Sequence, residues 1–238
     1  DMNKYERSFD AFTEHARTGK ILTGVVSSGF QRLRSEGISI LEIGPGDSLF
    51  TAVIAKAIGA KSSWMVDVGP YAIKEAESYI ELNNFLSSKG STFVFDEEPG
   101  NLDAVLEKCD GSYLTDGISS LSKIPDSSVG YCFSNAVLEH IPLLEFQKLA
   151  EETLRILAPE GVCVHRVDLK DHLGGGLNNL RFTERTWEGA MFKNSGFYTN
   201  RLRMVEIVAI FEKSGFDCEL LNVQKWDHLP LPRAALSE

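Results

Sequence analysis

The sequence predicts an α/β fold in which a doubly wound, mostly parallel sheet carries helices on both faces. Three observations support this. Apolar runs of strand length alternate with helical patterns along most of the 238 residues. The first strong strand, residues 38–43, ends in a glycine turn that leads directly into a helical pattern from Phe50. No internal repeat or low-complexity linker interrupts the alternation, so we expect one domain.

Two amphipathic helices are expected before the first strand. Tyr5, Phe9 and Phe12 recur with helical spacing, and a second apolar stripe runs from Leu22 to Leu33. Because these apolar faces need a partner, we expect residues 1–36 to form a helical cover over the ligand-binding side of the sheet.

The remaining elements follow from apolar periodicity and from glycine and proline punctuation. We expect strands at residues 38–43, 63–68, 92–95, 112–115, 129–135, 161–167 and 217–223. We expect helices at residues 50–58, 71–85, 143–157 and 202–213. Only a tail with two prolines follows residue 223.

Composition limits the function classes. The chain is 43% hydrophobic and 24% charged, with a formal charge of −10, which disfavours nucleic acid and anionic membranes as partners. No stretch is long and apolar enough for a membrane span. The four cysteines show neither CxxC pairing nor metal-ligand spacing, so a reducing, cytoplasmic compartment fits best.

The glycine turn lies in the stretch ILEIGPGDSLFTAVIA, with Gly44 and Gly46. At the end of a parallel strand, such a turn lets backbone amides approach a ligand. Asp67 closes the next predicted strand about 20 residues later, where a carboxylate can accept hydrogen bonds from ribose hydroxyls. These features fit a dinucleotide dehydrogenase, a nucleoside-binding transferase, or a structural turn beside a surface aspartate.

Two details favour the transferase. The third glycine of G-x-G-x-x-G is replaced by Leu49. Glu42 precedes the turn, and a carboxylate there suits a ligand with an ammonium group better than one with a pyrophosphate.

A later stretch, YLTDGISSLSKIPDSSVGYCFSNAVLEHIP, completes a pattern. Together with the glycine turn it resembles the class I S-adenosylmethionine-dependent methyltransferases of the small methyltransferase-domain branch. There, E-x-G-x-G is followed by an acidic ribose ligand, an Asp before L-P-D-x-S, and S-N-x-x-L-E-H. The resemblance covers residues 38–167.

The resemblance implies a seven-stranded Rossmann-like sheet that ends in an antiparallel strand, and S-adenosylmethionine as cofactor. Because only the tail follows residue 223, we expect this last strand to be missing, disordered or lost by truncation. The implied cofactor contacts are Glu42, Gly44 and Gly46 for the methionine end, Asp67 for the ribose, Asp116 and Gly117 for the adenine, and Asn135 for the cleft wall. Asp116 can alternatively cap a turn before Gly117. Ser48 stands at the third glycine position of the family's loop.

The single domain, residues 1–238, is accordingly divided into four parts. Residues 1–36 are the helical cover, residues 38–168 the cofactor-binding core, residues 170–203 a substrate-side insertion, and residues 204–238 a C-terminal helix, strand and tail.

An oxygen acceptor usually requires a general base, whereas a neutral amine does not. The candidates are His140, His172 and Asp168, which follow the two last core strands; His140 can alternatively be a helix-capping or cofactor-shell residue. Asp168, Asp171 and His172 could bind a divalent metal, but polar residues in a turn more often serve the loop itself, so we expect no metal. We expect His165, inside a strand, to be a packed histidine.

Residues 170–203 carry a net charge of +3 within an acidic chain and interleave aromatic side chains with asparagines. This composition suits a polar, ring-shaped substrate with a phosphate or carboxylate, or else a solvated loop with a few packed aromatics. The stretch DHLGGG…NNLRF…SGFYTNR looks like methyltransferases of glycan and sugar pathways.

The leading hypothesis is therefore an S-adenosylmethionine-dependent O-methyltransferase of a small polar acceptor, such as a sugar or glycan precursor, which can be anionic. The alternatives are an N-methyltransferase of a small amine, an NAD-dependent Rossmann protein and a non-catalytic module. The oligomeric state is left open.

Overall fold

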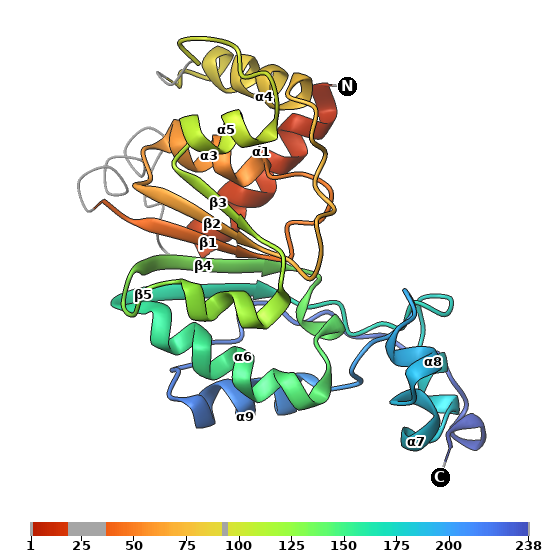
Figure 1. Cartoon of the computed structure of the whole chain (residues 1–238). Helices are drawn as coiled ribbons and strands as arrows, with labels where there is room; N and C mark the ends of the chain where they lie inside the picture. Colours follow the sequence, from red (N-terminus) through yellow and green to blue (C-terminus); the bar gives the residue numbers. More distant parts are fainter. Residues whose placement is uncertain (1, 19–36, 92–94, 238) are drawn as a thin grey trace. The chain divides into compact units, whose positions relative to one another are not determined.

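A computed structural model describes residues 2–18, 37–91 and 95–237. Among these, five strands form one sheet in the order β3-β2-β1-β4-β5 (Figure 1). The strands are β1 Ser39–Ile43, β2 Ser62–Val66, β3 Gly111–Leu114, β4 Val129–Asn135 and β5 Leu157–Arg166. β1 pairs in parallel with β2 and with β4, and β2 pairs in parallel with β3. The predicted α/β fold with a parallel sheet is confirmed.

Helices connect the strands. Before β4 lie α1 Met2–Thr18, α3 Phe50–Ile58, α4 Glu77–Ser88, α5 Leu102–Lys108 and the 3₁₀ turn η1 Gly117–Lys123. The later helices are η2 Leu138–His140, α6 Leu143–Ile156, η3 Asn178–Arg181, α7 Glu184–Trp187, α8 Ala190–Lys193, α9 Met204–Ser214 and η4 Arg233–Ala235. None of the described helices combines the length and apolar character needed to cross a bilayer.

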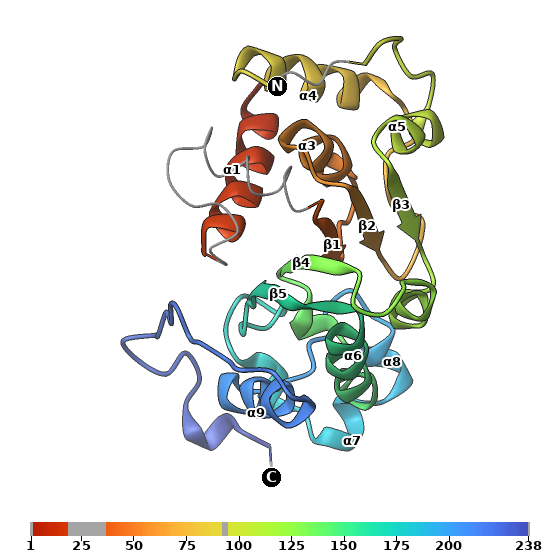
Figure 2. The ribbon, with the colours of Figure 1, turned by 90° about the vertical axis from the view of Figure 1, so that its left-hand side faces the viewer.

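The N-terminal helix α1 belongs to the hydrophobic core. It lies beside α3 and α4 (Figure 2). The Tyr5 ring lies 5.6 Å from the Phe50 ring, and the Phe12 ring lies 5.6 Å from the Phe133 ring of β4. Both α1 side chains are buried. The apolar partner expected for this helix is therefore the sheet and α3, whereas the second predicted helix, residues 22–33, lies outside the described residues.

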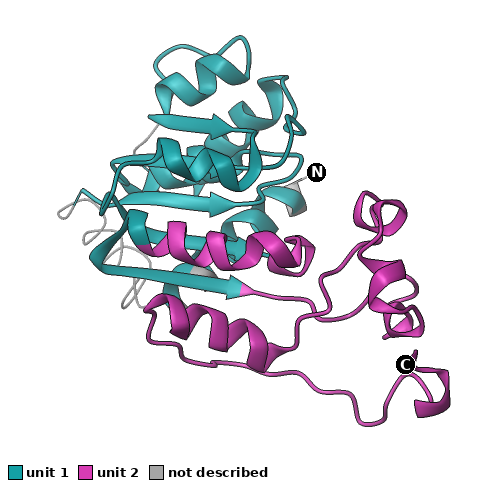
Figure 3. Ribbon diagram, turned by 60° about the horizontal axis from the view of Figure 1, so that its bottom comes forward, with its two compact units in different colours: residues 1–135, 155–165 teal, residues 136–154, 166–238 magenta. Residues whose placement is uncertain are grey.

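The chain divides into two compact units (Figure 3). Unit 1 consists of residues 1–135 and 155–165 and contains the sheet with α1, α3, α4 and α5. Unit 2 consists of residues 136–154 and 166–238 and contains η2, most of α6 and all the later helices. The chain first enters unit 2 directly after Asn135, the last residue of β4.

One predicted helix begins later than expected. Residues 71–76 precede α4, which starts at Glu77. Tyr113 of β3 explains the delay, because its hydroxyl donates to the Gly69 carbonyl at 2.8 Å and accepts the Tyr71 amide at 3.1 Å. These bonds hold the start of the segment as a loop.

The strand predicted at residues 217–223 is wrong, because this segment forms no strand in the described chain. Its consecutive side chains Leu220 and Leu221 are both exposed, without the alternation of a half-buried strand. The sheet therefore has five described strands, not the seven that the resemblance implies. The strand considered at residues 92–95 falls largely outside the described residues.

The burial of α1 predicts a stability effect. Phe12→Ala should lower the free energy of unfolding by about 3–5 kcal/mol, because it leaves a cavity against Tyr131 and Phe133. Phe197→Ala is the matched control, since the Phe197 side chain is 52% exposed. Urea unfolding of both variants is the measurement, and equal midpoints would contradict the packing of α1.

Candidate functional site

The glycine turn leaves β1 with two residues in the left-handed region. Gly44 and Gly46 both have φ of +71°. The Gly44 amide donates to the Val66 carbonyl at the end of β2, at 2.8 Å. A Cβ atom added at Gly46 would meet no other atom within 4 Å, so the backbone there faces open space. The turn therefore presents bare backbone at the carboxyl edge of the sheet, where ligands approach such folds.

Asp67 ties three turns of this edge together. Its carboxylate accepts the Gly46 amide at 3.0 Å and the Val68 amide at 2.7 Å. Its carbonyl accepts the Gly117 amide at 2.8 Å. One residue thus connects the turns that follow β1, β2 and β3. Each carboxylate oxygen keeps a lone pair, because an ionised carboxylate has about four acceptor sites.

Glu42 and Asn135 line the same cavity of about 150 Å³ beside the glycine turn. They come from the neighbouring strands β1 and β4. Ser8 and Phe12 of α1 and Ser48 after the turn complete its wall. A second cavity, of about 260 Å³, shares Ser8, Ser48 and Phe50 with the first and adds the cations Lys4 and Arg7. The Glu42 carboxyl, the Asn135 amide and the glycine turn thus border one cavity.

The Glu42 carboxyl is held in an unfavourable environment for its charge. Its pKa is raised from 4.5 to about 7, mainly by burial; a hydrogen bond with Thr51 opposes this rise, and the nearby Asp67 charge contributes to it. The N-cap residue of α3 is Leu49, which makes no side-chain capping hydrogen bond. A cation entering the cavity would restore the ionised form.

Asp116 and Gly117 follow β3 and lie on the turn that Asp67 holds. The Asp116 side chain does not cap η1; its Oδ2 pairs with Lys123 at 2.7 Å, while its amide donates to Ser120. Gly117 has φ of +58°, and a Cβ atom there would lie 3.3 Å from Val68. The second carboxylate oxygen of Asp116, on an exposed side chain, can still accept a donor.

Unit 2 brings the base candidates together. The rings of His140 and His172 are 4.7 Å apart between centroids. His140 Nδ1 lies 2.9 Å from the Tyr198 carbonyl, which can only accept, so Nδ1 carries the proton and Nε2 the lone pair. Burial lowers the pKa of His140, which keeps the imidazole neutral at neutral pH. This is the protonation state of a general base.

Glu139 and Asn200 support these histidines and were not singled out from the sequence. The buried Glu139 carboxylate accepts the Asp168 amide at 3.3 Å, and burial raises the pKa of Glu139. The Asn200 side chain donates to the Leu138 carbonyl at 2.7 Å and the Ile141 carbonyl at 2.9 Å. Its amide donates to the Glu139 carbonyl at 2.7 Å. The sequence offered only their positions as a sign of this role: Glu139 lies in the stretch SNAVLEH and Asn200 in the stretch SGFYTNR.

The segment 170–203 is more tightly packed than its composition suggests. Trp187 is fully buried, and its indole donates to the Thr199 carbonyl at 2.7 Å. Arg201 lies 5.8 Å over the Trp187 ring, and Arg203 pairs with Glu206 at 2.8 Å. Trp187 and Tyr198 therefore form a small core and do not line an open pocket.

The loop that contains Gly174, Gly175 and Gly176 is held by hydrogen bonds of Asp171. Asp171 is buried and its carboxylate accepts the amides of Leu173 and Asn178. Its own amide donates to the Gly176 carbonyl at 3.0 Å. The Asp171 carboxylate is thus bonded to its own loop.

Comparison with known proteins shows that the chain matches the model of one protein family. A family model described as a methyltransferase domain matches residues 15–221, most of the chain. A proposed protein N5-glutamine methyltransferase of Methanocaldococcus jannaschii is 39% identical over 67 residues, which are 28% of this chain and 34% of that protein. The match thus spans about one third of that relative's length.

Solved structures align with this chain at lower sequence identity. An arsenic(III) S-adenosylmethionine methyltransferase from Chlamydomonas reinhardtii aligns with 18% identity over 75% of this chain and 52% of its own, at a TM-score of 0.44. An S-adenosylmethionine-dependent methyltransferase from Archaeoglobus fulgidus aligns with 14% identity over 94% of this chain and 86% of its own, at a TM-score of 0.43.

The raised pKa of Glu42 predicts a pH dependence of stability. Between pH 4.5 and about 7 the folded chain keeps a proton that the unfolded chain has lost. The contribution of Glu42 therefore lowers the free energy of unfolding as pH rises through this window, by roughly 1.4 kcal/mol per pH unit. Glu42→Gln should remove this component. Urea unfolding at about pH 5 and about pH 7.5 measures it, and parallel pH profiles for both proteins would refute the assignment.

Proposed function

The chain belongs to the methyltransferase-domain family, whose class I members take a methyl group from S-adenosylmethionine, and we propose that it methylates an oxygen atom of a small polar acceptor. The observation that carries the proposal is the set of turns joined by Asp67, with the cavity of Glu42 and Asn135 beside them. The relatives act on different acceptors, so the acceptor proposed here follows from this chain's own residues.

The residues of unit 1 fit the cofactor. Asp67 has lone pairs for two ribose hydroxyls after accepting its two backbone amides. The open space over Gly46 allows close approach, and Gly44 and Gly46 would lie against the methionine end. Glu42 would hold the ammonium group, which removes the cost of its buried charge. We assign the wall beside the methyl group to Asn135.

We assign the adenine to the turn after β3. The exocyclic amine would donate to the Asp116 oxygen that Lys123 does not hold. The absence of a side chain at Gly117 lets this turn lie close to Val68, because a Cβ atom at Gly117 would be 3.3 Å from the Val68 side chain. The same turn is bonded to Asp67, so ribose and adenine contacts are positioned together.

The bound cofactor supplies an electrophilic methyl group on a positively charged sulfur. The chain need not stabilise a developing anion at that sulfur; its work is to align the acceptor and to exclude water. The helix α1 serves the second task, because Ser8 and Phe12 close one side of the cavity.

The proposed base is His140, with Nε2 as the proton acceptor. Its tautomer is set by the Tyr198 carbonyl, and its neutral state by burial. His172 and Asp168 are the further candidates in the same cluster. In the chain, His140 follows Asn135 by five positions, on the loop that leaves β4. We infer a small polar acceptor, sugar-like or anionic, beside the exposed polar side chains of residues 170–203.

A small amine is the second candidate acceptor. The buried Glu139 carboxyl next to the histidines favours it, since a carboxylate can hold an ammonium group. A neutral amine needs no base, so the histidine variants distinguish the two reactions. The dinucleotide-dependent alternative is set aside by the family match. The setting we propose is cytoplasmic, and the four cysteines, all among the described residues, form no disulfide.

Transfer itself is tested by incubating the chain with methyl-labelled cofactor and a panel of sugars, phenols and amines. Labelled product from a hydroxyl acceptor supports the proposal. Label on amines alone supports the second candidate, and cofactor binding without any transfer indicates a non-catalytic module.

Cofactor binding is predicted to depend on Asp67. Asp67→Ala should weaken adenosylhomocysteine binding by about 1–3 kcal/mol, or roughly 5- to 150-fold in Kd, because a charge-assisted hydrogen bond is lost. Asp96→Ala, at an exposed bend, is the matched control. Calorimetric titration measures both, with melting temperatures to check folding. Unchanged affinity in a folded Asp67→Ala protein would remove Asp67 from the site.

Turnover is predicted to depend on His140. His140→Asn keeps a side-chain donor for the Tyr198 carbonyl but has no Nε2 lone pair. It should lower kcat roughly 10²–10⁴-fold without changing the Kd of adenosylhomocysteine. The wild-type fall of kcat at acidic pH, set by the lowered pKa of His140, should vanish in the variant. His228→Asn, in the tail, is the control. Normal turnover in His140→Asn would transfer the role to His172 or Asp168, or favour an amine.

A further inference from the structure

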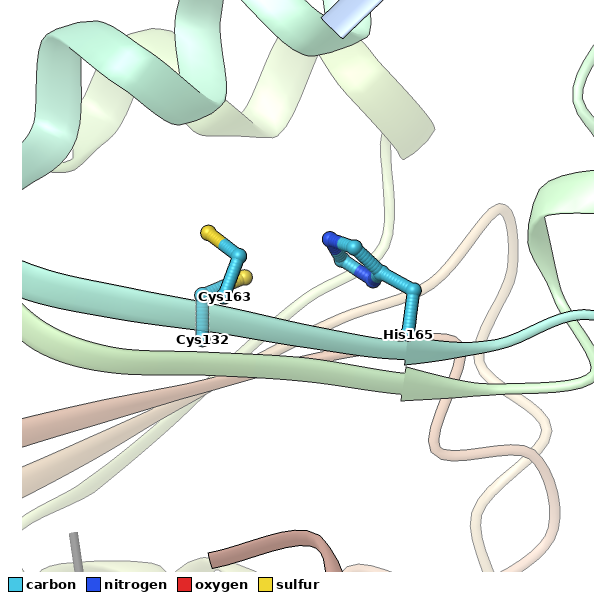
Figure 4. A group of neighbouring side chains, drawn as sticks. All are labelled: Cys132, Cys163 and His165. Carbon is cyan, nitrogen blue, oxygen red and sulfur yellow. The ribbon is translucent and has the colours of Figure 1, made fainter. Parts of the chain in front are cut away.

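Cys132, Cys163 and His165 meet on the two last strands of the sheet, within unit 1. Cys132 lies on β4, and the other two lie on β5 (Figure 4). Side chains of a strand alternate between its two faces, and Tyr131 and Phe133 contact Phe12 of α1. Cys132 therefore faces the side of the sheet opposite α1, away from the cavity of Glu42.

The three side chains are close enough to share one ion. Their two sulfur atoms and one imidazole nitrogen all lie within 4.8 Å of one another. Zn–S and Zn–N bonds of about 2.3 and 2.0–2.1 Å place tetrahedral ligands about 3.5–3.8 Å apart. Among the histidine, cysteine, aspartate and glutamate side chains of the described residues, these three form the group whose ligand atoms are close enough to share an ion.

The hydrogen bonding of His165 is typical of a metal-binding histidine. Ser134 Oγ lies 2.8 Å from His165 Nδ1, and Figure 4 shows a ring nitrogen of His165 directed toward the two sulfur atoms. Metal-binding histidines commonly have one nitrogen on the ion and the other held by a hydrogen-bonding partner.

We propose that Cys132, Cys163 and His165 form a binding site for a thiophilic divalent metal ion of the Zn²⁺ type. Cys132 and Cys163 bind through sulfur, and His165 binds through Nε2, with Ser134 orienting the ring. The three ligands leave one tetrahedral position for water or another ligand. The ion joins β4 to β5, and the inference stands independently of methyl transfer.

The experiment loads the full chain, purified with a reductant, with Zn²⁺ and then dialyses it against metal-free buffer. One zinc per chain should remain. Loading with Co²⁺ should give the near-ultraviolet thiolate-to-cobalt absorption and the visible bands of a tetrahedral site. Zinc should also raise Tm. A Co²⁺ spectrum without thiolate absorption, or no retained metal, would overturn the proposal.

Variants assign the ligands. Cys163→Ser and His165→Asn should each weaken Zn²⁺ binding more than about a hundredfold, since even the loss of a residue that only orients a ligand costs about 10–100-fold. Ser134→Ala, which removes only the group that orients His165, should weaken Zn²⁺ binding by about 10–100-fold. Cys218→Ser, at a half-buried cysteine outside the group, should bind as the wild type. Wild-type affinity in both Cys163→Ser and His165→Asn would refute the site.

Alkylation of the unmodified chain provides a test that does not depend on variant folding. Zn²⁺ should slow the alkylation of Cys132 and Cys163 and leave the rate at Cys218 unchanged, as mapped by mass spectrometry. Equal rates with and without Zn²⁺ would contradict the proposal. So would a Cys132–Cys163 disulfide in the zinc-loaded protein, which would identify the pair as a redox couple.

Discussion

The candidate site in unit 1 depends on what a single aspartate does with its backbone and side chain at once. Asp67 accepts the amides of Gly46 and Val68 through its carboxylate and that of Gly117 through its carbonyl. Parallel strands end at a common edge, but the turns beyond them have no ladder to hold them. Asp67 connects them: its bonds with Gly46 and Gly117 join the turn after β2 to the turns after β1 and β3, and its bond with Val68 holds its own turn.

Local signals were sufficient for much of this architecture. β4 occupies the residues that its apolar run predicts, Val129–Asn135, and α3 runs from Phe50 to the left-handed Gly59. Each of these boundaries is encoded within a few residues, by periodicity or by a glycine that permits positive φ. The glycine turn and Asp67 were recognisable for the same reason, although their mutual hydrogen bond was not.

The features that the sequence did not predict depend on contacts between residues that are distant in the sequence. The start of α4 is delayed by Tyr113, a residue of another strand, and residues 217–223 have strand-like composition but no strand to pair with. Asn200 holds the turn of His140 across about sixty positions of chain. The group of Cys132 and His165 likewise becomes visible only when β5 lies beside β4, because spacing along the chain shows no ligand pattern.

The placement of α1 has a kinetic consequence. Ser8 and Phe12 form part of the wall around the cavity of Glu42, and Phe12 is at the same time packed into the core. A molecule bound in this cavity would contact a side chain that also stabilises the fold. Its escape would then be coupled to the local unfolding of the first helix, so substitutions that loosen α1 would change both stability and release.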